Sequence, residues 1–346
     1  MRFLVVGLGS MGARRIRNLQ FLQAGTIVGM DPREDRRQRA AEKYDVVSWA
    51  TLEEAMAVRP DAIIISTPPD FHDHYMWRAA ELGVSFFCEA SVEARGRGEL
   101  ARLCEERGIL AAPSFTFRCH PQIKRLKHLV DSGAIGRVVA FTYQSGQYLP
   151  DWHPWEHIRD YYVSKRETGA CREMVPFELL WLCWIMGEVT AVSCFKDKLA
   201  GLEADIDDVY QLLLRFESGA LGHLLVDVVA RTPVRVCRFT GDRGVLEWDA
   251  GRKQVRLFRA GAGAWEEYSD EEQVVEPGYV NAENMYIEEM RHFLAALQGK
   301  STYPFSLREE ERILSLLQAA EASAQQGRHV RSHGARRAED RGTSHV

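Results

Sequence analysis

The residues best suited to chemistry stand at the start of the chain, in the run Gly7-Leu8-Gly9-Ser10-Met11-Gly12. The first glycine of such a run permits a tight turn, the second lets the backbone approach a pyrophosphate, and the third lets a helix pack closely on the preceding strand. The N-terminus of that helix presents free N–H groups to phosphate oxygens. We therefore predict a dinucleotide site here, with the cofactor-binding residues Gly7, Gly9, Ser10, Met11 and Gly12.

The type of dinucleotide depends on Asp31 and on three arginines that follow it, Arg33, Arg36 and Arg37. Asp31 ends a second apolar stretch, at the position where a carboxylate bonds ribose hydroxyls. A carboxylate repels a 2′-phosphate, whereas an arginine accommodates it. We interpret the arginines as the solvated face of a charged helix over 33–44. The sequence therefore favours NAD, with NADP as the alternative.

A second group of reactive side chains lies between residues 147 and 173, where aromatic and charged residues are dense. Aromatic faces with directional polar groups suit sugars, and arginine or lysine suits anionic groups. We expect this segment to contact a small-molecule substrate, because binding residues concentrate on loops held by a scaffold. The alternative is a surface loop packed by its own tryptophans. The expected substrate-binding residues are Arg118, Trp152, His153, Arg159, Arg166 and Glu178.

Within this segment, His153, Glu156 and His157 have the spacing of the zinc pattern H-x-x-E-H. Pro154 suits only a first helical turn, which would leave His153 at the cap and badly aimed. Because no further ligand motif follows, we expect no metal ion.

The elements that must hold these residues fall into two patterns. Apolar strands alternate with helices up to about residue 111, which predicts an α/β unit with a Rossmann-type, doubly wound parallel sheet. From Phe115 onward β-rich runs separated by turns at 217–220 and 241–244 predict an α+β unit with a large, mostly antiparallel open sheet. Its expected strands are 138–143, 189–195, 209–216, 221–229, 234–239, 245–248 and 255–258, and its later helices are 176–186, 280–298 and 306–325.

These patterns predict a dinucleotide-binding domain over 1–116, a substrate and oligomerisation domain over 117–327, and a disordered polar tail over 328–346.

A formal charge of −5 argues against nucleic acid as a partner. Seven cysteines without a CxxC pair suit a reducing cytosol. The longest apolar run, 179–186, is too short to span a membrane, and the N-terminal run breaks at Gly7, unlike a signal peptide. We expect a cytoplasmic protein without a membrane partner.

Five features of the sequence belong together: the glycine run, Thr67-Pro68 with His72, Glu89 after Phe86-Phe87-Cys88, the run 131–136, and the hairpin at Ser218-Gly219. Together these motifs resemble the Gfo/Idh/MocA family of glucose–fructose oxidoreductases and inositol dehydrogenases. The resemblance covers about residues 1–326 and implies a nicotinamide cofactor, a sugar or sugar-nucleotide substrate, and a homo-oligomer, a dimer or tetramer, built on the open sheet. It adds Thr67, Pro68, His72 and Glu89 to the expected cofactor site.

The chain departs from this family at the two residues that usually transfer protons. The lysine of the family's Glu-Lys-Pro motif is replaced by Ala90, and the position of the general acid/base histidine, counted back from Gly187, falls on Phe177. The acid four residues before that histidine falls on Glu173. The resemblance therefore implies that another side chain transfers the proton.

Lys165 is the first candidate for this proton transfer, with Glu173 and Tyr161 as further catalytic residues; Tyr162, His153 and Glu178 are also considered. A lysine desolvated among aromatic rings can act as an acid/base near neutral pH. We expect Lys165 to be held by Tyr161 or Glu173 and partly desolvated by Trp152 and Trp155.

The predicted function is an NAD(P)-dependent oxidoreductase acting on a hydroxyl or carbonyl of a sugar, aminosugar or sugar nucleotide. The alternatives are a sugar sensor that has lost its chemistry and an NAD-dependent lyase or hydrolase that oxidises its substrate transiently.

Overall fold

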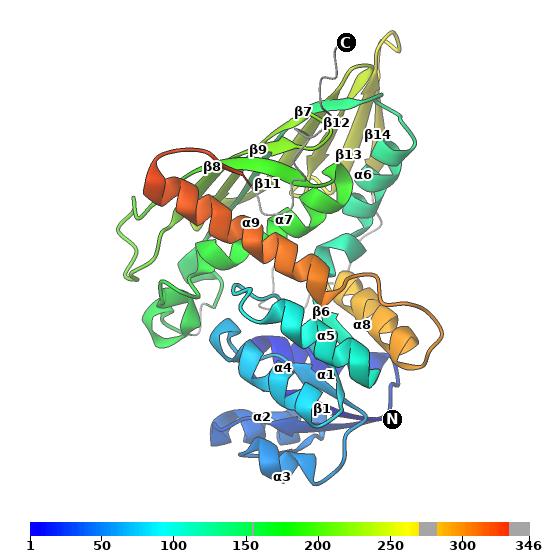
Figure 1. Ribbon diagram of the computed structural model, residues 1–346, viewed down its shortest axis with the longest axis vertical. Coiled ribbons are helices and arrows are strands. Elements are labelled where there is room, and N and C mark those ends of the chain that lie inside the picture. The colour runs from blue at the N-terminus through cyan, green and yellow to red at the C-terminus, as the bar shows by residue number, and fades with distance from the viewer. Residues whose placement is uncertain (154–155, 270–281, 332–346) are drawn as a thin grey trace, which may run out of the picture.

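In the computed structural model, residues 1–153, 156–269 and 282–331 are described, and their strands form two separate sheets (Figure 1). The described strands of the first sheet pair in parallel in the order β3-β2-β1-β4-β5-β6, as predicted. They are β1 (Arg2–Val6), β2 (Thr26–Met30), β3 (Val47–Trp49), β4 (Ala62–Ile65), β5 (Ser85–Cys88) and β6 (Ala111–Pro113). The chain order reverses between β1 and β4, where doubly wound sheets bind ligands at the carboxyl ends of the strands.

Helices connect the strands of the first sheet, and α2 agrees with the helix predicted over 33–44 to within one residue. They are α1 (Ser10–Phe21), α2 (Glu34–Tyr44), α3 (Leu52–Met56), η1 (Pro69–Phe71), α4 (His72–Glu81) and α5 (Arg97–Arg107). Thr51 begins α3 with a capping box: its side chain accepts from the Glu54 N–H, and the Glu54 carboxylate accepts from the Thr51 N–H.

The second sheet has the order β14-β13-β12-β11-β7-β10-β9-β8-β15 and is antiparallel except for the parallel pair β7 and β10. Its strands are β7 (Val138–Tyr148), β8 (Val189–Asp197), β9 (Val209–Phe216), β10 (Leu221–Asp227), β11 (Val229–Gly241), β12 (Gly244–Asp249), β13 (Gln254–Arg259), β14 (Trp265–Ser269) and β15 (Val330–Arg331). The remaining elements are η2 (Thr116–Cys119), α6 (Pro121–Asp131), η3 (Leu149–Asp151), η4 (Ile158–Asp160), η5 (Tyr162–Ser164), α7 (Ala170–Met186), α8 (Asn284–Leu297) and α9 (Leu307–Gln326).

Helices α6, α7 and α9 pack on one face of the second sheet (Figure 1). The opposite face carries exposed side chains that alternate with core residues, as in β9, where Leu213 is exposed between the buried Leu212 and Leu214. An apolar core runs without interruption from Phe87 of the first sheet, past Phe117 of η2, to the second sheet. The two sheets are therefore held together by apolar packing as well as by the polar contacts described below.

Four details of the expected elements were wrong. α7 begins at Ala170 rather than at 176 and continues through Pro176, which lacks an N–H donor; buried side chains on its flanks hold the helix together. The run expected over 221–229 divides at Val228 between β10 and β11, and β14 was not predicted. Residues 330–331, expected within a disordered tail, pair with β8. The rest of that tail, 332–346, and Trp155 lie outside the described residues, and the domain boundaries remain a prediction.

Candidate active site

The glycine turn after β1 is shaped by close backbone contacts. Gly7 has a φ of +88°, and a Cβ at this residue would lie 2.6 Å from the Ser66 carbonyl oxygen. A Cβ at Gly12 would lie 1.8 Å from the Gly7 carbonyl oxygen. Gly9 differs, because the nearest atom to its Cβ position is Arg36 Nη1, at an ordinary contact distance of 3.5 Å. The backbone at Gly9 therefore faces the space above the turn, beside the N-terminus of α1, which starts at Ser10 and Met11.

Asp31 is buried at the end of β2 and is bonded to the same turn. Its Oδ2 accepts from the Leu8 N–H at 2.8 Å, and its Oδ1 accepts from the Arg33 N–H at 2.9 Å. Arg36 Nη1 lies 3.5 Å from Oδ2, whereas the Arg33 guanidinium pairs with Asp35. Arg37 donates to the carbonyls of Asp31 and Pro32. Arg36 thus lies over both Gly9 and Asp31, so it is more than part of a solvated helix face.

Thr67 and Pro68 follow β4 beside the glycine turn, and His72 fixes their position. The His72 ring is buried, with Nε2 2.9 Å from the Thr67 carbonyl oxygen and Nδ1 3.0 Å from the Ser91 hydroxyl. Burial lowers the pKa of His72 to about 4, so the ring is neutral at pH 7 and Nε2 donates to the carbonyl. The buried Thr67 Oγ1 has no hydrogen-bond partner among the described residues. His72 therefore supports the turn, and the Thr67 hydroxyl remains available to a ligand.

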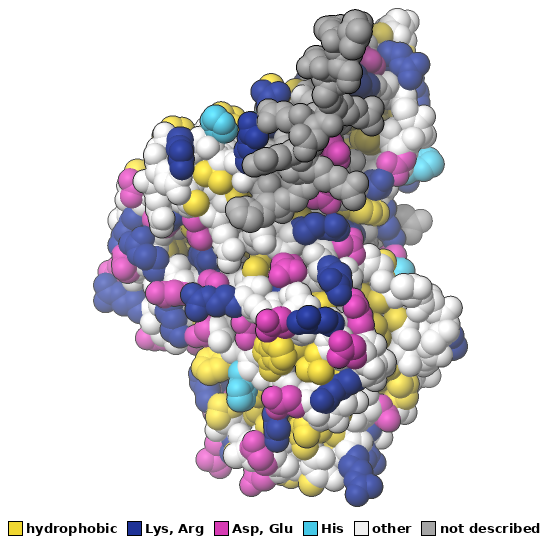
Figure 2. Space-filling view, viewed as in Figure 1, with side chains coloured by type: hydrophobic (Ala, Val, Ile, Leu, Met, Phe, Trp, Pro, Cys, Tyr) yellow, Lys and Arg dark blue, Asp and Glu magenta, His cyan; other side chains and the backbone are white. Residues whose placement is uncertain are grey.

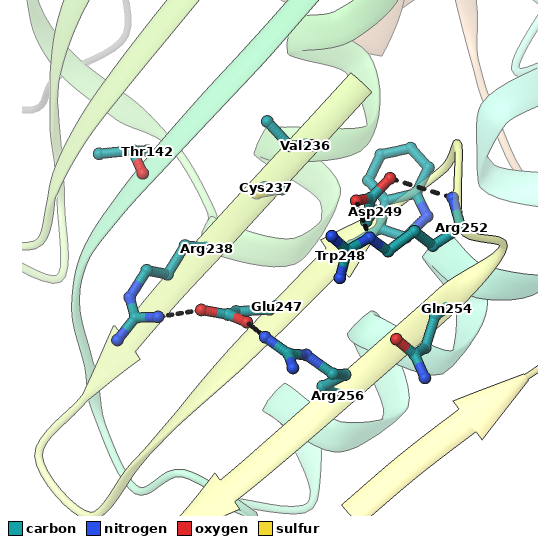
Figure 3. A pocket seen from close by; sticks show the side chains of 10 residues that line it. All are labelled: Thr142, Val236, Cys237, Arg238, Glu247, Trp248, Asp249, Arg252, Gln254 and Arg256. Atoms are coloured by element: carbon teal, nitrogen blue, oxygen red, sulfur yellow. Dashed lines mark hydrogen bonds and ion pairs between the residues drawn. The ribbon is translucent and has the colours of Figure 1, made fainter. Parts of the chain in front are cut away.

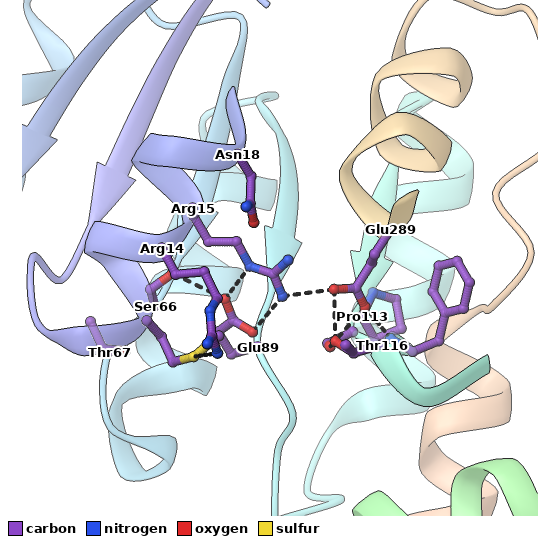
Figure 4. A network of polar contacts seen from close by, with 12 residues as sticks. Arg14, Arg15, Asn18, Ser66, Thr67, Glu89, Pro113, Thr116 and Glu289 are labelled. Atoms are coloured by element: carbon purple, nitrogen blue, oxygen red, sulfur yellow. Dashed lines mark hydrogen bonds and ion pairs between the residues drawn. The ribbon is translucent and has the colours of Figure 1, made fainter. Parts of the chain in front are cut away.

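Glu89, which follows β5, belongs to a buried charge network that joins the first sheet to α8 (Figure 4). Arg15 of α1 donates from Nε and Nη2 to the two Glu89 oxygens at 2.6 and 2.8 Å. Its Nη2 also donates to Glu289 at 2.7 Å. Glu289 accepts three more hydrogen bonds, from the Ser114 hydroxyl, the Phe115 N–H and the Thr116 hydroxyl.

Sequence reasoning missed Arg15 and Glu289. The signal for Glu289 was its position inside the apolar stripe of α8, between the buried Tyr286 and Met290. A carboxylate at such a position is expected to be paired, because an unpaired buried charge is costly.

Four residues of the segment 147–173 lie together: His153, Tyr161, Tyr162 and Glu173. The rings of His153 and Tyr161 stack with centroids 4.8 Å apart, and the Tyr161 and Tyr162 rings meet edge to face. The Tyr162 hydroxyl donates to Glu173 Oε1 at 3.3 Å. Trp152 Nε1, the Tyr161 hydroxyl oxygen and Glu173 Oε2 are buried and have no hydrogen-bond partner among the described residues. Such atoms need a ligand or ordered water as a partner.

Glu173 lies in the first turn of α7, and its environment suits proton exchange near neutral pH. Burial raises the pKa of Glu173 to about 7, the Tyr162 hydrogen bond opposes that shift, and the charge of Glu89 adds to it. Glu173 therefore lies close enough to Glu89, at the end of β5, to interact with it electrostatically. The charge of Arg36 likewise acts on His153. The aromatic segment thus lies near the carboxyl-terminal edge of the first sheet.

Phe177, which we predict to stand at the family's usual histidine position, carries no titratable group. The Phe177 ring packs against Phe117 with centroids 4.5 Å apart. Glu173, one helical turn earlier, is the titratable side chain nearest in sequence on the same side of α7.

Lys165 is not placed as expected. Its Nζ lies 2.9 Å from Asp70 Oδ2 and its side chain is 55% exposed, so it is neither held by Tyr161 or Glu173 nor desolvated. The structure therefore contradicts the environment predicted for Lys165.

Arg118 and Glu178 have structural contacts that do not fit the expected substrate binding. The Glu178 carboxylate is fully buried and accepts from Tyr143, Ser145, Trp181 and Arg235 at 2.8–3.0 Å. The Arg118 guanidinium is buried over the Phe305 ring. Both residues thus make contacts within the protein that differ from those expected of substrate-binding residues, although Arg118 Nε is buried without a hydrogen-bond partner among the described residues. Their assignment to the substrate site stays a prediction.

Arg159 and Arg166 lie on the surface and pair with the loop 198–208. Arg159 pairs with Glu203, and Arg166 pairs with Asp205 and Asp207. These ion pairs hold the aromatic segment against that loop.

A pocket of about 190 Å³ lies on the face of the second sheet opposite α6, α7 and α9 (Figure 3). We call this the helix-free face, because no described helix packs on it. Glu247 lies there between Arg238 and Arg256 and pairs with both. On the face drawn in Figure 2, Lys and Arg are interspersed with Asp and Glu over the described surface. In the described part of the chain, no helix is long and apolar enough to cross a membrane.

Two family models match the chain. Residues 1–114 match the oxidoreductase family with an NAD-binding Rossmann fold, and residues 123–247 match the GFO/IDH/MocA C-terminal domain. The chain belongs to the Gfo/Idh/MocA family of oxidoreductases, as its motifs predicted.

Similar proteins include both dehydrogenases and a hydratase. The chain is 28% identical over 246 residues to scyllo-inositol 2-dehydrogenase (NAD(+)) of Bacillus subtilis, covering 64% of this chain and 66% of that protein. It is 28% identical over 166 residues to 2,7-anhydro-N-acetylneuraminate hydratase of Mediterraneibacter gnavus, covering 46% of this chain and 43% of that protein. These matches thus span about half to two thirds of the relatives' length. The fold is also that of an oxidoreductase from Agrobacterium radiobacter, which was solved with NAD+, L-tartaric acid and magnesium. The two structures match with a TM-score of 0.84 and 16% sequence identity, over 96% of this chain and 98% of that chain.

Proposed function

We propose that this protein is an NAD-dependent oxidoreductase that oxidises a hydroxyl of a neutral sugar or polyol, with Glu173 as the proton acceptor. The observation that carries the proposal is the Glu173 carboxyl: its Oε2 is buried without a hydrogen-bond partner among the described residues, and burial raises its pKa to about 7. A general base is most effective when its pKa lies near the working pH. Counted back from Gly187, Glu173 is also the residue expected at the acidic position of the family motif.

The residues around the glycine turn fit a dinucleotide. The three atoms nearest to a Gly9 Cβ belong to the flexible Arg36 side chain, so a pyrophosphate can approach the backbone there if that side chain moves. Asp31 retains lone pairs for ribose hydroxyls, and the Thr67 hydroxyl lacks a partner among the described residues. Once bound, the nicotinamide supplies an acceptor for the hydride that leaves the carbinol carbon. At the substrate hydroxyl, Glu173 Oε2 accepts the hydroxyl proton as the C=O bond forms.

Tyr162 and the aromatic cluster would support this proton transfer. Tyr162 holds Glu173 Oε1 and leaves Oε2 to face the substrate. Trp152 Nε1 and the Tyr161 hydroxyl offer two further polar atoms for sugar hydroxyls, and the aromatic rings offer apolar surface for the sugar face. Proton transfer by a positioned side chain contributes about 10²–10⁴-fold to rate.

The pairing of the nearby cations supports a neutral substrate. Arg159 pairs with Glu203, and Lys165 pairs with Asp70. Arg166 pairs with Asp205 and Asp207. Arg172 binds Glu321 and Glu93. An anionic group would have to compete with these carboxylates and would lie near Glu173 and Glu89. We therefore favour a neutral sugar or polyol over a sugar acid or a sugar nucleotide.

NADH formation tests this proposal directly. The full-length protein is incubated with NAD+ and, in parallel, with neutral polyols, sugar acids and sugar nucleotides, and absorbance of the reduced nicotinamide is followed. We expect turnover with a neutral compound and tighter binding of NAD than of NADP, measured by calorimetry. Turnover confined to anionic substrates would contradict the neutral-substrate assignment.

A redox-neutral reaction is the second candidate, and the similarity to a hydratase favours it. In that case a substrate is converted without net NADH formation, yet conversion still needs bound NAD. Chromatography of the same reaction mixtures distinguishes the two: product without NADH supports the redox-neutral reaction, and product with equimolar NADH supports the oxidation.

We also propose that the chain forms a homo-oligomer through the helix-free face of the second sheet. Phe195, Leu213 and Leu221 are 74%, 54% and 49% exposed there. Light scattering is expected to show a dimer or tetramer that Leu213→Glu dissociates and that Leu82→Glu, at an exposed site on the first part of the chain, leaves intact.

A further inference from the structure

We infer that Cys119, Glu288 and His292 form a binding site for a divalent transition metal, best suited to zinc, where η2 meets α8. One ligand atom from each residue lies within 4.8 Å of the other two. Thiolate, imidazole and carboxylate are the three side-chain groups that zinc binds in proteins. The sequence offers no compact motif here because the ligands come from positions far apart in the chain.

The geometry needs little change to hold a metal ion. Glu288 and His292 are one turn apart on the same face of α8, with Glu288 Oε1 and His292 Nε2 3.9 Å apart. In a tetrahedral zinc site with bonds of about 2.0–2.3 Å, ligand atoms lie roughly 3.3–3.8 Å from one another. The two α8 side chains are partly exposed, so a small rotation of each can supply the remaining ångström, while Cys119 is fixed in the core at 2% exposure.

Two neighbours define the surroundings of this site. The Phe115 ring lies beside the His292 ring, with centroids 5.7 Å apart, and limits where that imidazole can turn. Lys124 Nζ lies 2.6 and 2.8 Å from the two Glu288 oxygens. The Lys124 side chain is 43% exposed, so a metal ion can displace its ammonium into solvent. Lys124 is thus the competing cation of the site.

The position of the cluster favours a structural role for the metal. Glu288 is next to Glu289, which binds Ser114, Phe115 and Thr116 at the start of η2. A metal ion bound by Cys119 and α8 would join the same two elements a second time. Three protein ligands leave one coordination position for water, so the structural role rests on the position of the cluster and not on a closed set of four protein ligands. The site is independent of the proposed proton transfer at Glu173.

Cobalt(II), which replaces zinc and absorbs light, tests the site in the full-length protein after treatment with a chelator. We expect a thiolate-to-cobalt charge-transfer band, displacement of cobalt by zinc, and a rise in melting temperature with zinc. Cys119→Ser should abolish the band, and Cys104→Ser, at another buried cysteine, should retain it. Absence of the band in the wild-type protein would overturn the proposal.

Two variants at exposed positions keep the test valid if Cys119→Ser fails to fold. His292→Asn should weaken zinc binding by about tenfold or more, because even the loss of a supporting residue costs that much. Lys124→Met should tighten zinc binding, because it removes the competing ammonium. Unchanged zinc affinity in His292→Asn, or no gain in Lys124→Met, would contradict the site.

Discussion

The Tyr162 hydroxyl donates a hydrogen bond to Glu173 Oε1 at 3.3 Å and leaves Oε2 of the same carboxyl buried without a partner in the described part of the chain. This arrangement separates the two oxygens: one is held in place, and the other is available to a substrate. It also opposes part of the rise that burial causes in the pKa of Glu173.

Removal of the Tyr162 hydroxyl should move the pH dependence of the reaction upward. The hydrogen bond favours the ionised carboxyl, so Tyr162→Phe raises the pKa of Glu173 further above its ordinary value. Because a general base must be ionised to act, the acidic limb of kcat/KM should shift to higher pH, by about one unit. The control is Tyr268→Phe in β14, which removes another tyrosine–glutamate hydrogen bond. An unchanged limb in Tyr162→Phe would show that Glu173 does not control the rate.

Gly9→Val should abolish NAD binding in a folded protein. The φ of Gly9 is −72°, which valine adopts, and its Cβ position lies 3.5 Å from the flexible Arg36 side chain. The added methyl groups would instead fill the space above the turn, where the pyrophosphate is expected. Calorimetry measures binding, and circular dichroism checks the fold. Gly201→Val, at a glycine with open space around it, is the control; retained NAD binding in Gly9→Val would exclude this turn as the phosphate site.

Arg15→Met should strongly destabilise the protein. It leaves the carboxylates of Glu89 and Glu289 without their shared cation, and breaking a buried pair costs about 3–5 kcal/mol. Urea unfolding measures the loss. Arg33→Met removes a pair whose side chains are each 54% exposed and should cost less than about 1 kcal/mol. Equal effects of the two substitutions would contradict the account of the network.

Local spacing was sufficient to predict the parts of the site that lie close together in sequence. Gly7, Gly12 and Asp31 are near one another along the chain, and their backbone constraints follow from one strand–turn–helix unit. Their placement could therefore be deduced before the fold was known. The same holds for the parallel sheet, whose strands are short apolar runs.

Partners from distant parts of the chain could not be deduced in this way. Lys165 was expected among aromatic rings, but its partner Asp70 lies 95 residues earlier. Glu178 was expected to bind the substrate, yet residues of β7 and β11 donate hydrogen bonds to its carboxylate in the core. A helix was expected to start at 176, whereas α7 begins at Ala170, continues through Pro176 and has Glu173 in its first turn. A sequence gives the type of such a side chain, while its ionisation depends on neighbours that only the fold supplies.

The most direct test of the central claim is the pH dependence of kcat/KM for wild-type protein and Glu173→Gln, with a substrate found by NADH formation. We predict a wild-type acidic limb near pH 7, set by the pKa of Glu173 at about 7. In Glu173→Gln the limb should disappear and the rate should fall about 10²–10⁴-fold, with unchanged NAD affinity. Glu167→Gln, at an exposed carboxylate six residues earlier, should behave as wild type. A Glu173→Gln protein that keeps both the limb and the wild-type rate would contradict the assignment of Glu173 as the proton acceptor.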